Sequence, residues 1–359
     1  MTATDRADDR LRFARAATGD PDLDLHPASS DASFRSYWRG HSGHRSWIVM
    51  DAPPEREDIR PWLEIDLRLR QAGLLAPEVI ASDAEHGFVV MTDLGDRLLL
   101  PALSADTFDP LYRQALDSLV SLQVQADSTG LPEYDEARLV AEMELMPTWF
   151  LERHLGVLPE CEQWDIIESA FRALVGSALE QPKVFVHRDF HSRNLMLHGD
   201  ALAIIDFQDA VRGPVTYDPV SLLRDCYIAW PEQQVYRLLE DYRRRLLATA
   251  RSPADRADRS SQTSALARAL ADCDGARFRR WFDLMGLQRH LKVLGIFCRL
   301  YYRDGKSGYL NDLPRVWDYV HRVGREYDAI RPLVDLLARA IAGRDLTEPN
   351  PTSDRGDRS

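Results

Sequence analysis

Three polar side chains in one short stretch have the types and the order that phosphoryl transfer needs. Asp189 is followed by Asn194 five residues later and by Asp206 twelve residues after that. A carboxylate such as Asp189 can accept a proton from a hydroxyl group, and Asn and Asp oxygens are good ligands for Mg²⁺. Transfer of a phosphoryl group from ATP needs a base of this kind and a metal ion on the phosphates. The stretch therefore predicts a kinase site.

The elements around these residues are predicted to hold them in place. Residues 184–186 form a short apolar run of β-branched and aromatic type, which is typical of a buried strand, and Asp189 lies in the loop that follows. Residues 195–197 and 201–205 are two more apolar runs, separated by Gly199-Asp200. Glycine in the first position favours a type II′ hairpin turn. This hairpin would bring Asn194 beside Asp206.

The segments His187-x-Asp189-x-x-x-x-Asn194 and Ile205-Asp206-Phe207-Gln208-Asp209 resemble the catalytic loop and metal-binding segment of the aminoglycoside phosphotransferase/choline kinase superfamily. The resemblance implies an α+β, bilobal protein-kinase-like fold with a small β-rich N-lobe and a larger, mainly helical C-lobe. It also implies ATP and Mg²⁺ as cofactors, with Asp189 as the base and Asn194 and Asp206 as metal ligands. Only ten residues separate Asp206 from Tyr217-Asp218-Pro219, too few for the activation loop of a protein kinase.

Four segments are expected along the chain. They are a flexible N-terminus (1–10), a nucleotide-binding N-lobe (11–92), a catalytic and acceptor-binding C-lobe (93–346) and a disordered polar tail (347–359). Asp218-Pro219 reads as an N-cap and a first helical residue, with a metal ligand as the alternative for Asp218. Apolar periodicity predicts helices over residues 61–74, 108–125, 139–155, 164–179, 220–230, 234–250, 277–302 and 313–342.

The nucleotide is expected in the N-terminal third. The Ser-rich segment 29–39 lies where a strand-turn-strand would cover the phosphates, and its backbone N–H groups could hold phosphate oxygens. A hinge with backbone groups for adenine is expected around residues 91–94, with a plain strand-to-helix turn as the alternative. The resulting candidates for nucleotide binding are Ser30, Asp31, Ser33, Phe34, Arg35, Met91, Asp93 and Leu94.

The strand predicted over residues 46–51 departs from the family pattern. The resemblance implies a phosphate-binding lysine near Met50, and the strand contains none. Arg35, Arg39 or backbone donors alone could take its place. Glu64 is the candidate for the acidic partner of that cation.

Length and composition bound the class of protein. A chain of 359 residues is long enough for one two-lobed enzyme with its own core. The net charge of −12 argues against nucleic acid and anionic membranes as partners, the apolar runs are shorter than a membrane span, and no signal peptide is visible. The four cysteines lack metal-ligand spacing. We expect a cytoplasmic monomer that acts on a small molecule.

The acceptor is predicted from a wider resemblance. Residues 50–55, 186–196 and 205–214 are similar to the bacterial anomeric sugar kinases of the superfamily. This similarity implies phosphorylation of the C1 hydroxyl of N-acetylmuramate and N-acetylglucosamine, in peptidoglycan recycling. Basic residues on the helix over 277–302 would suit an acidic acceptor, although a solvated basic face is the alternative. The candidate acceptor residues are Arg188, Arg193, Asp209, Arg289, His290 and Lys292.

Two other functions remain open at this point. One is a kinase for an aminoglycoside or another small alcohol. The other is a nucleotide-binding regulator without catalysis, which the missing lysine favours and the presence of Asp189, Asn194 and Asp206 disfavours.

Overall fold

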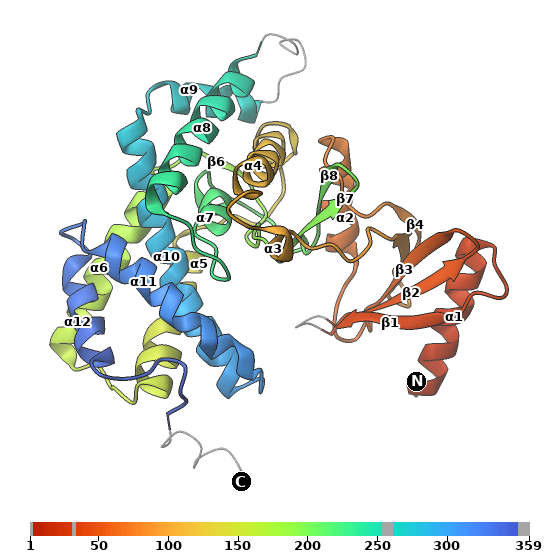
Figure 1. Cartoon of the computed structure of the whole chain (residues 1–359), viewed down its shortest axis with the longest axis horizontal. Helices are drawn as coiled ribbons and strands as arrows, with labels where there is room; N and C mark the ends of the chain where they lie inside the picture. The colour runs from red at the N-terminus through yellow and green to blue at the C-terminus, as the bar shows by residue number, and fades with distance from the viewer. Residues whose placement is uncertain (1–2, 31–33, 253–260, 351–359) are drawn as a thin grey trace. The chain divides into compact units, whose positions relative to one another are not determined.

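The computed structural model describes residues 3–30, 34–252 and 261–350. The chain divides into two compact units, one formed by Met1–Leu111 with Arg193–Asp209 and the other by Tyr112–Ser192 with Ala210–Ser359. A five-stranded sheet dominates the first unit and helices dominate the second (Figure 1). The predicted α+β class, with a β-rich part followed by a mainly helical part, is confirmed.

The sheet of the first unit is antiparallel and has the strand order β1-β2-β3-β5-β4. Its core side is covered by the N-terminal helix α1, where Ala14 packs with Val49 and Val90. Met50 on β3 is fully buried between Tyr37 of β2 and Val89 of β5 in the register of the sheet. The bounds of these elements are α1 Ala3–Thr18, β1 Leu25–Ser30, β2 Ser36–Ser42, β3 Arg45–Asp51, β4 Val79–Asp83 and β5 Phe88–Thr92.

Helix α1 corrects the expectation of a flexible N-terminus over residues 1–10, as far as these residues are described. Arg6 and Arg10 on α1 both form ion pairs with the buried Asp51, at 2.6 and 2.8 Å. The guanidinium of Arg10 also lies 3.6 Å from the centre of the Trp38 ring. A buried carboxylate needs cationic partners, so these contacts fix the start of the chain on the sheet.

Four further elements complete the first unit: α2 Arg60–Gln71, α3 Leu99–Ala102, β7 Leu195–His198 and β8 Ala201–Ile204. The β7-β8 hairpin forms bridges from Met196 to Leu98 and from Ala203 to Leu75. The first unit thus extends beyond the expected boundary at residue 92 and includes a hairpin from much later in the chain. Gly199 has φ +59° in the two-residue turn and Asp200 has no positive φ, as a type II′ turn requires.

The second unit is built around the long helix α10, Gly275–Tyr302, which contacts most of its other helices (Figure 1). Strands β6 Lys183–Val186 and β9 Val211–Pro214 pair antiparallel. The remaining elements are α4 Phe108–Gln125, which begins in the first unit, α5 Glu136–Met143, η1 Met146–His154, α6 Cys161–Leu179, α7 Tyr217–Leu223, α8 Glu232–Arg251, α9 Ser261–Ala271, η3 Ser307–Asp312, α11 Leu313–Gly324 and α12 Arg331–Ile341.

Two predicted helices differ from the structure by more than a few residues. The helix over 139–155 is split into α5 and the π-helix η1, which begins beside Pro147, and proline cannot continue a regular ladder of hydrogen bonds. The helix over 220–230 ends at Leu223. The final helices expected over 313–342 are α11 and α12. In the predicted tail, Asn350 donates hydrogen bonds to Tyr302 and to the Arg153 carbonyl, while residues 351–359 lie outside the described ones.

No helix within the described ranges combines the length and the apolar character needed to cross a membrane.

Candidate nucleotide and phosphoryl-transfer site

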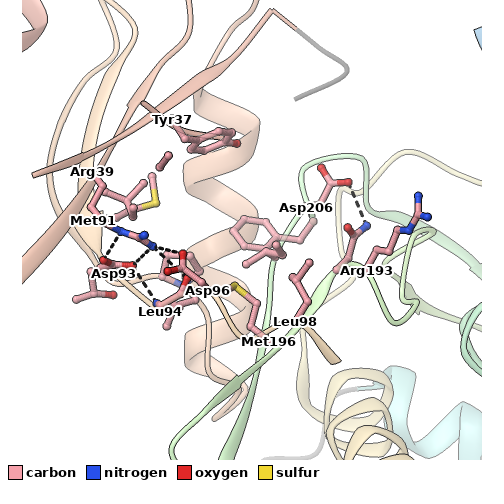
Figure 2. Close-up of a pocket in the computed structure, with 18 of the residues that line it drawn as sticks. Tyr37, Arg39, Met91, Asp93, Leu94, Asp96, Leu98, Arg193, Met196 and Asp206 are labelled. Carbon is pink, nitrogen blue, oxygen red and sulfur yellow. Dashed lines mark hydrogen bonds and ion pairs between the residues drawn. The ribbon is translucent and has the colours of Figure 1, made fainter. Parts of the chain in front are cut away.

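A pocket of about 440 Å³ lies within the first unit (Figure 2). Its walls are mainly apolar, and a few polar side chains converge at its two ends, which is typical of small-molecule sites. The expected hinge residues Met91, Asp93 and Leu94 line it together with Asn194 and Asp206. The other lining residues are Ala28, Tyr37, Arg39, Ile48, Trp62, Pro77, Thr92, Gly95, Asp96, Leu98, Arg193, Met196, Ile205 and Phe207.

Arg39 on β2 holds the segment 93–96, where the adenine-binding hinge is expected, at one end of the pocket (Figure 2). Its guanidinium is 2.7 Å from Asp93 and 2.7 Å from Asp96, and it donates to the Gly95 carbonyl at 3.2 Å. Burial alone would raise the pKa of Asp93, but hydrogen bonds from Arg39 and from the Gly95 N–H hold it below its usual value. The guanidinium of Arg39 is therefore already engaged by two carboxylates at this end of the pocket.

The β7-β8 hairpin brings the two predicted metal ligands together. Asn194 Nδ2 lies 3.1 Å from Asp206 Oδ2, and Ile205 N donates to the Asn194 carbonyl at 3.1 Å. Asp206 has φ +62°, a left-handed conformation that is costly for a residue with a side chain and is concentrated at functional sites. Figure 2 shows Asp206 at the end of the pocket away from Arg39, Asp93 and Asp96. One carboxylate and one carboxamide at this spacing form a donor set that fits Mg²⁺.

The segment expected to cover the phosphates, residues 29–39, is described only in part. Asp31 and Ser33 lie outside the described residues, as does the side chain of Ser30. Phe34 is 61% exposed, whereas the Arg35 side chain is buried beside Asp206. The prediction of Glu64 as an acidic partner is wrong, because Glu64 lies on the exposed side of α2 and pairs with Arg68.

The loop that carries Asp189 belongs to the second unit and is held by two buried carboxylates. Asp218 accepts hydrogen bonds from the backbone N–H groups of His187 and Arg188, at 2.7 and 3.0 Å. Asp225 accepts from the Ser192 N–H at 2.9 Å and from its hydroxyl. Asp218 is therefore not the N-cap of α7, a position that Thr216 occupies. Arg188 has φ +76°, so this anchoring holds a strained backbone at the loop.

Replacement of Asp218 by Asn should destabilise the second unit. Burial raises the pKa of Asp218 to about 7, against the lowering effect of the two backbone N–H donors. The NH₂ group of an asparagine would face one of those backbone N–H groups, which would then have no acceptor. A buried donor without an acceptor lowers the free energy of unfolding by about 1–3 kcal/mol. Urea unfolding would measure the loss, with the exposed Asp106→Asn as the matched control. Equal stability of the two variants would contradict this role of Asp218.

Cationic side chains determine the charge state of Asp189. Burial alone would raise the pKa of Asp189, but the charges of Lys292, His191, Arg289 and Arg188 hold it below its usual value. The carboxylate thus stays ionised at neutral pH, as a proton acceptor must. Its cations come from its own loop and from α10, so the second unit assembles the environment of the base.

Glu142 on α5 organises two of these cations. It lies 2.6 Å from Arg188 and 3.0 Å from Lys292, and it accepts a hydrogen bond from the Tyr134 hydroxyl. Lys292 also donates to the Tyr217 hydroxyl at 3.1 Å. Burial by itself would raise the pKa of Glu142, but Lys292 and Arg188 hold it below its usual value. Arg188 and Lys292 therefore share one buried carboxylate as their ion-pair partner.

Of the other predicted acceptor residues, His290 and Arg289 are buried in the second unit, whereas Arg193 and Asp209 belong to the first. His290 cannot be a cationic partner, because burial and the charge of Arg289 lower its pKa to about 3. Its Nε2 lies 3.0 Å from the Arg224 carbonyl. Arg289 donates to the Cys226 sulfur at 3.2 Å. Arg193 lines the pocket of the first unit, and Asp209 is exposed at the end of that unit.

Sequence reasoning missed three carboxylates of the site: Glu57, Glu142 and Asp225. Each belongs to a segment whose pattern is that of an ordinary loop or amphipathic helix, and each finds its partner far away in the sequence. The burial of Glu142 beside a buried lysine is the signal that identifies it, and it is visible only in the folded chain.

The fold and the site together define a phosphotransferase of the kinase-like type. The model of the phosphotransferase enzyme family matches residues 24–255, well over half of the chain. The chain belongs to this family.

Relatives extend the match over almost the whole length. The N-acetylmuramate/N-acetylglucosamine kinase of Pseudomonas aeruginosa is 44% identical over 324 residues, covering 90% of each chain. The protein of the same name from Neisseria meningitidis is 38% identical over 330 residues, covering 90% of this chain and 93% of its own.

Solved structures agree on the fold. An ethanolamine kinase from Plasmodium vivax matches with a TM-score of 0.58 at 10% identity, covering 90% of this chain and 88% of its own. An ADP-bound aminoglycoside phosphotransferase, APH(2'')-Ib, matches with a TM-score of 0.52 at 15% identity, covering 85% and 96%. At such identities the likeness concerns the fold alone.

Proposed function

We propose that this chain is an ATP-dependent kinase that phosphorylates the C1 hydroxyl of N-acetylmuramate and N-acetylglucosamine. The observation that carries the proposal is the 44% identity with a kinase named for these two sugars, over 90% of both chains. The sugar 1-phosphates would return wall fragments to metabolism, in peptidoglycan recycling within the cytoplasm. We expect the enzyme to act as a monomer.

The pocket of the first unit is the proposed ATP site. The apolar walls near Ile48 and Met196 offer faces for the adenine ring, and the hinge at Asp93 and Leu94 offers backbone groups. Leu94 is held in turn by His198, whose Nδ1 lies 3.2 Å from the Leu94 carbonyl. We assign Arg193 to this nucleotide site as well, because it lines the same pocket.

Asn194 and Asp206 are the proposed ligands of Mg²⁺, which when bound would offset charge on the phosphate oxygens. Asp189 orients the C1 hydroxyl of the acceptor and removes its proton as the hydroxyl oxygen attacks the γ-phosphorus. The ionised state of Asp189 at neutral pH supports this role. Asp189 belongs to the second unit and Asn194 to the first, and the two residues are only five positions apart in the chain.

Turnover of Mg²⁺-ATP with each sugar tests the function directly. We expect ADP release and a 1-phosphate product with both amino sugars, and none with an aminoglycoside or with choline. Turnover with an aminoglycoside alone would replace this proposal with the first alternative. ATP binding without turnover of any acceptor would favour the non-catalytic regulator.

Arg289 is the proposed partner of the lactyl carboxylate, which N-acetylmuramate has and N-acetylglucosamine lacks. The charge of Arg289 acts on Asp189, but among the described residues no carboxylate lies within ion-pair distance of its guanidinium. Its hydrogen bond goes to the weakly accepting sulfur of Cys226. Arg188 and Lys292 differ, since both already pair with Glu142. The planar guanidinium fork of Arg289 matches a carboxylate with two hydrogen bonds.

Replacement of Arg289 by Gln should therefore raise KM for N-acetylmuramate and leave KM for N-acetylglucosamine nearly unchanged. A hydrogen bond to a charged group contributes about 1.5–3 kcal/mol, which corresponds to roughly a 10- to 150-fold change. Steady-state kinetics with both sugars would measure it, and Arg280→Gln, on the exposed face of the same helix, is the matched control. An equal effect on the two sugars would show that the carboxylate binds elsewhere.

A further inference from the structure

Met50 stands on β3 where the family resemblance implies a phosphate-binding lysine, and its side chain is part of the buried core of the sheet. Glu64, the expected acidic partner of that lysine, is directed to solvent. A different pair lies beside Asp206. Arg35, just before β2, has its Nε 3.2 Å from Glu57 and an Nη nitrogen 3.7 Å from Asp206. Its side chain is only 5% exposed, whereas that of Asp206 is 36% exposed.

We propose that Arg35 contacts the α- and β-phosphates of the nucleotide directly, and that Glu57 is the positioning residue that holds it. This inference rests on the use of ATP in the proposed function and does not depend on which sugar is the acceptor.

The geometry of a guanidinium explains how one residue can serve both partners. Arginine presents five N–H donors in a planar fork, so Nε can stay with Glu57 while the Nη groups face phosphate oxygens. Arg35 does not itself line the pocket, but an Nη nitrogen of its fork lies 3.7 Å from Asp206, which does. A lysine also has three donors, but it is a point charge on a flexible stem, whereas the planar fork of an arginine fixes the directions of its hydrogen bonds.

Arg39 on β2 is a second arginine beside the pocket, and its surroundings exclude it from this role. Its guanidinium already contacts Asp93, Asp96 and the Gly95 carbonyl at the hinge. A phosphate would have to compete with two carboxylates there. Of the two partners of Arg35, Asp206 is the more exposed. Asp206 is also the proposed metal ligand, so we expect it to bind a metal ion when the nucleotide binds and to leave the Nη groups of Arg35 to the phosphates.

Calorimetric titration with ADP, AMP and adenosine in the presence of a chelator tests the contact without turnover. Arg35→Gln should weaken ADP binding by roughly 10- to 150-fold, the change expected for a hydrogen bond to a charged group. Adenosine affinity should change little. Arg60→Gln makes the same charge change at an exposed arginine paired with Asp58 and should leave both affinities unchanged. Equal losses of ADP and adenosine affinity, or no loss of either, would overturn the proposal.

A double-mutant cycle separates a direct contact from an effect through Asp206. If Arg35 only neutralises Asp206, then Arg35→Gln in an Asp206→Asn background should no longer weaken ADP binding. We expect the loss to persist, and its disappearance would overturn the direct contact.

Glu57→Gln tests the positioning role. We expect a smaller loss of ADP affinity than in Arg35→Gln and again little change for adenosine. Because this variant keeps the arginine, it also provides the test if Arg35→Gln does not fold. Unchanged ADP affinity in Glu57→Gln would remove Glu57 from the assignment. The protein could also bind ADP in a way that depends on Arg35 and yet phosphorylate neither sugar. That result would support the contact between Arg35 and the phosphates and would contradict the proposed acceptor.

Discussion

Asp189→Asn should lower kcat by roughly 10²- to 10⁴-fold, the usual range for the loss of a positioned general base. The amide keeps the shape of the side chain but cannot accept the hydroxyl proton. Because Asp189 belongs to the second unit and the nucleotide pocket to the first, ATP affinity should stay close to that of the wild type. Single-turnover kinetics together with ATP titration would separate the two effects.

The pH profile of the wild type gives an independent check of this assignment. The cations around Asp189 hold its pKa below its usual value, so the base stays available as the pH falls from neutral to mildly acidic values. The pH at which kcat/KM begins to fall on the acid side should therefore lie below this neutral to mildly acidic range. Near wild-type turnover in a folded Asp189→Asn protein would show that Asp189 is not the base.

Asp206→Ala should abolish the Mg²⁺ dependence of ATP binding and lower kcat/KM by roughly 100-fold or more, since a metal ion on the phosphates contributes several kcal/mol. The variant removes the charged member of the ligand pair. Asn194→Ala removes a neutral ligand and should have the same effect in milder form. Titration of ATP affinity against Mg²⁺ concentration would measure both.

The matched control is Asp200→Ala, which removes an exposed carboxylate from the turn of the same hairpin. It should leave the Mg²⁺ titration unchanged. If Asp206→Ala and Asn194→Ala also titrate like the wild type, the metal is held by other residues.

Local sequence signals were sufficient to predict the hairpin and the close approach of Asn194 and Asp206, the proposed metal ligands. The two apolar runs and Gly199 define a two-residue turn, and such a turn fixes the register of the strands it joins. Once the register is set, Asn194 and Asp206 must be neighbours, as the 3.1 Å contact between them shows. The helix predicted over 108–125 has the same bounds in the structure because its apolar stripe is unbroken.

The N-terminal helix shows where such reasoning stops. The first residues are polar and resemble a disordered end, yet Arg6 and Arg10 lie on a helix that is fixed to the sheet through Asp51. Nothing near residue 6 in the sequence identifies a buried carboxylate 45 positions away as its partner.

The same limit applies to the charges of the site. By itself the sequence determined the family resemblance and the candidates for the base and the metal ligands, because those residues are set by the spacing within one loop and one hairpin. Only the tertiary structure decided that Glu57, and not Glu64, faces a buried arginine. It also decided that Glu142 compensates two of the cations around Asp189. Periodicity shows which side of an element is buried, but the partner of a buried charge depends on the packing of elements that are distant along the chain.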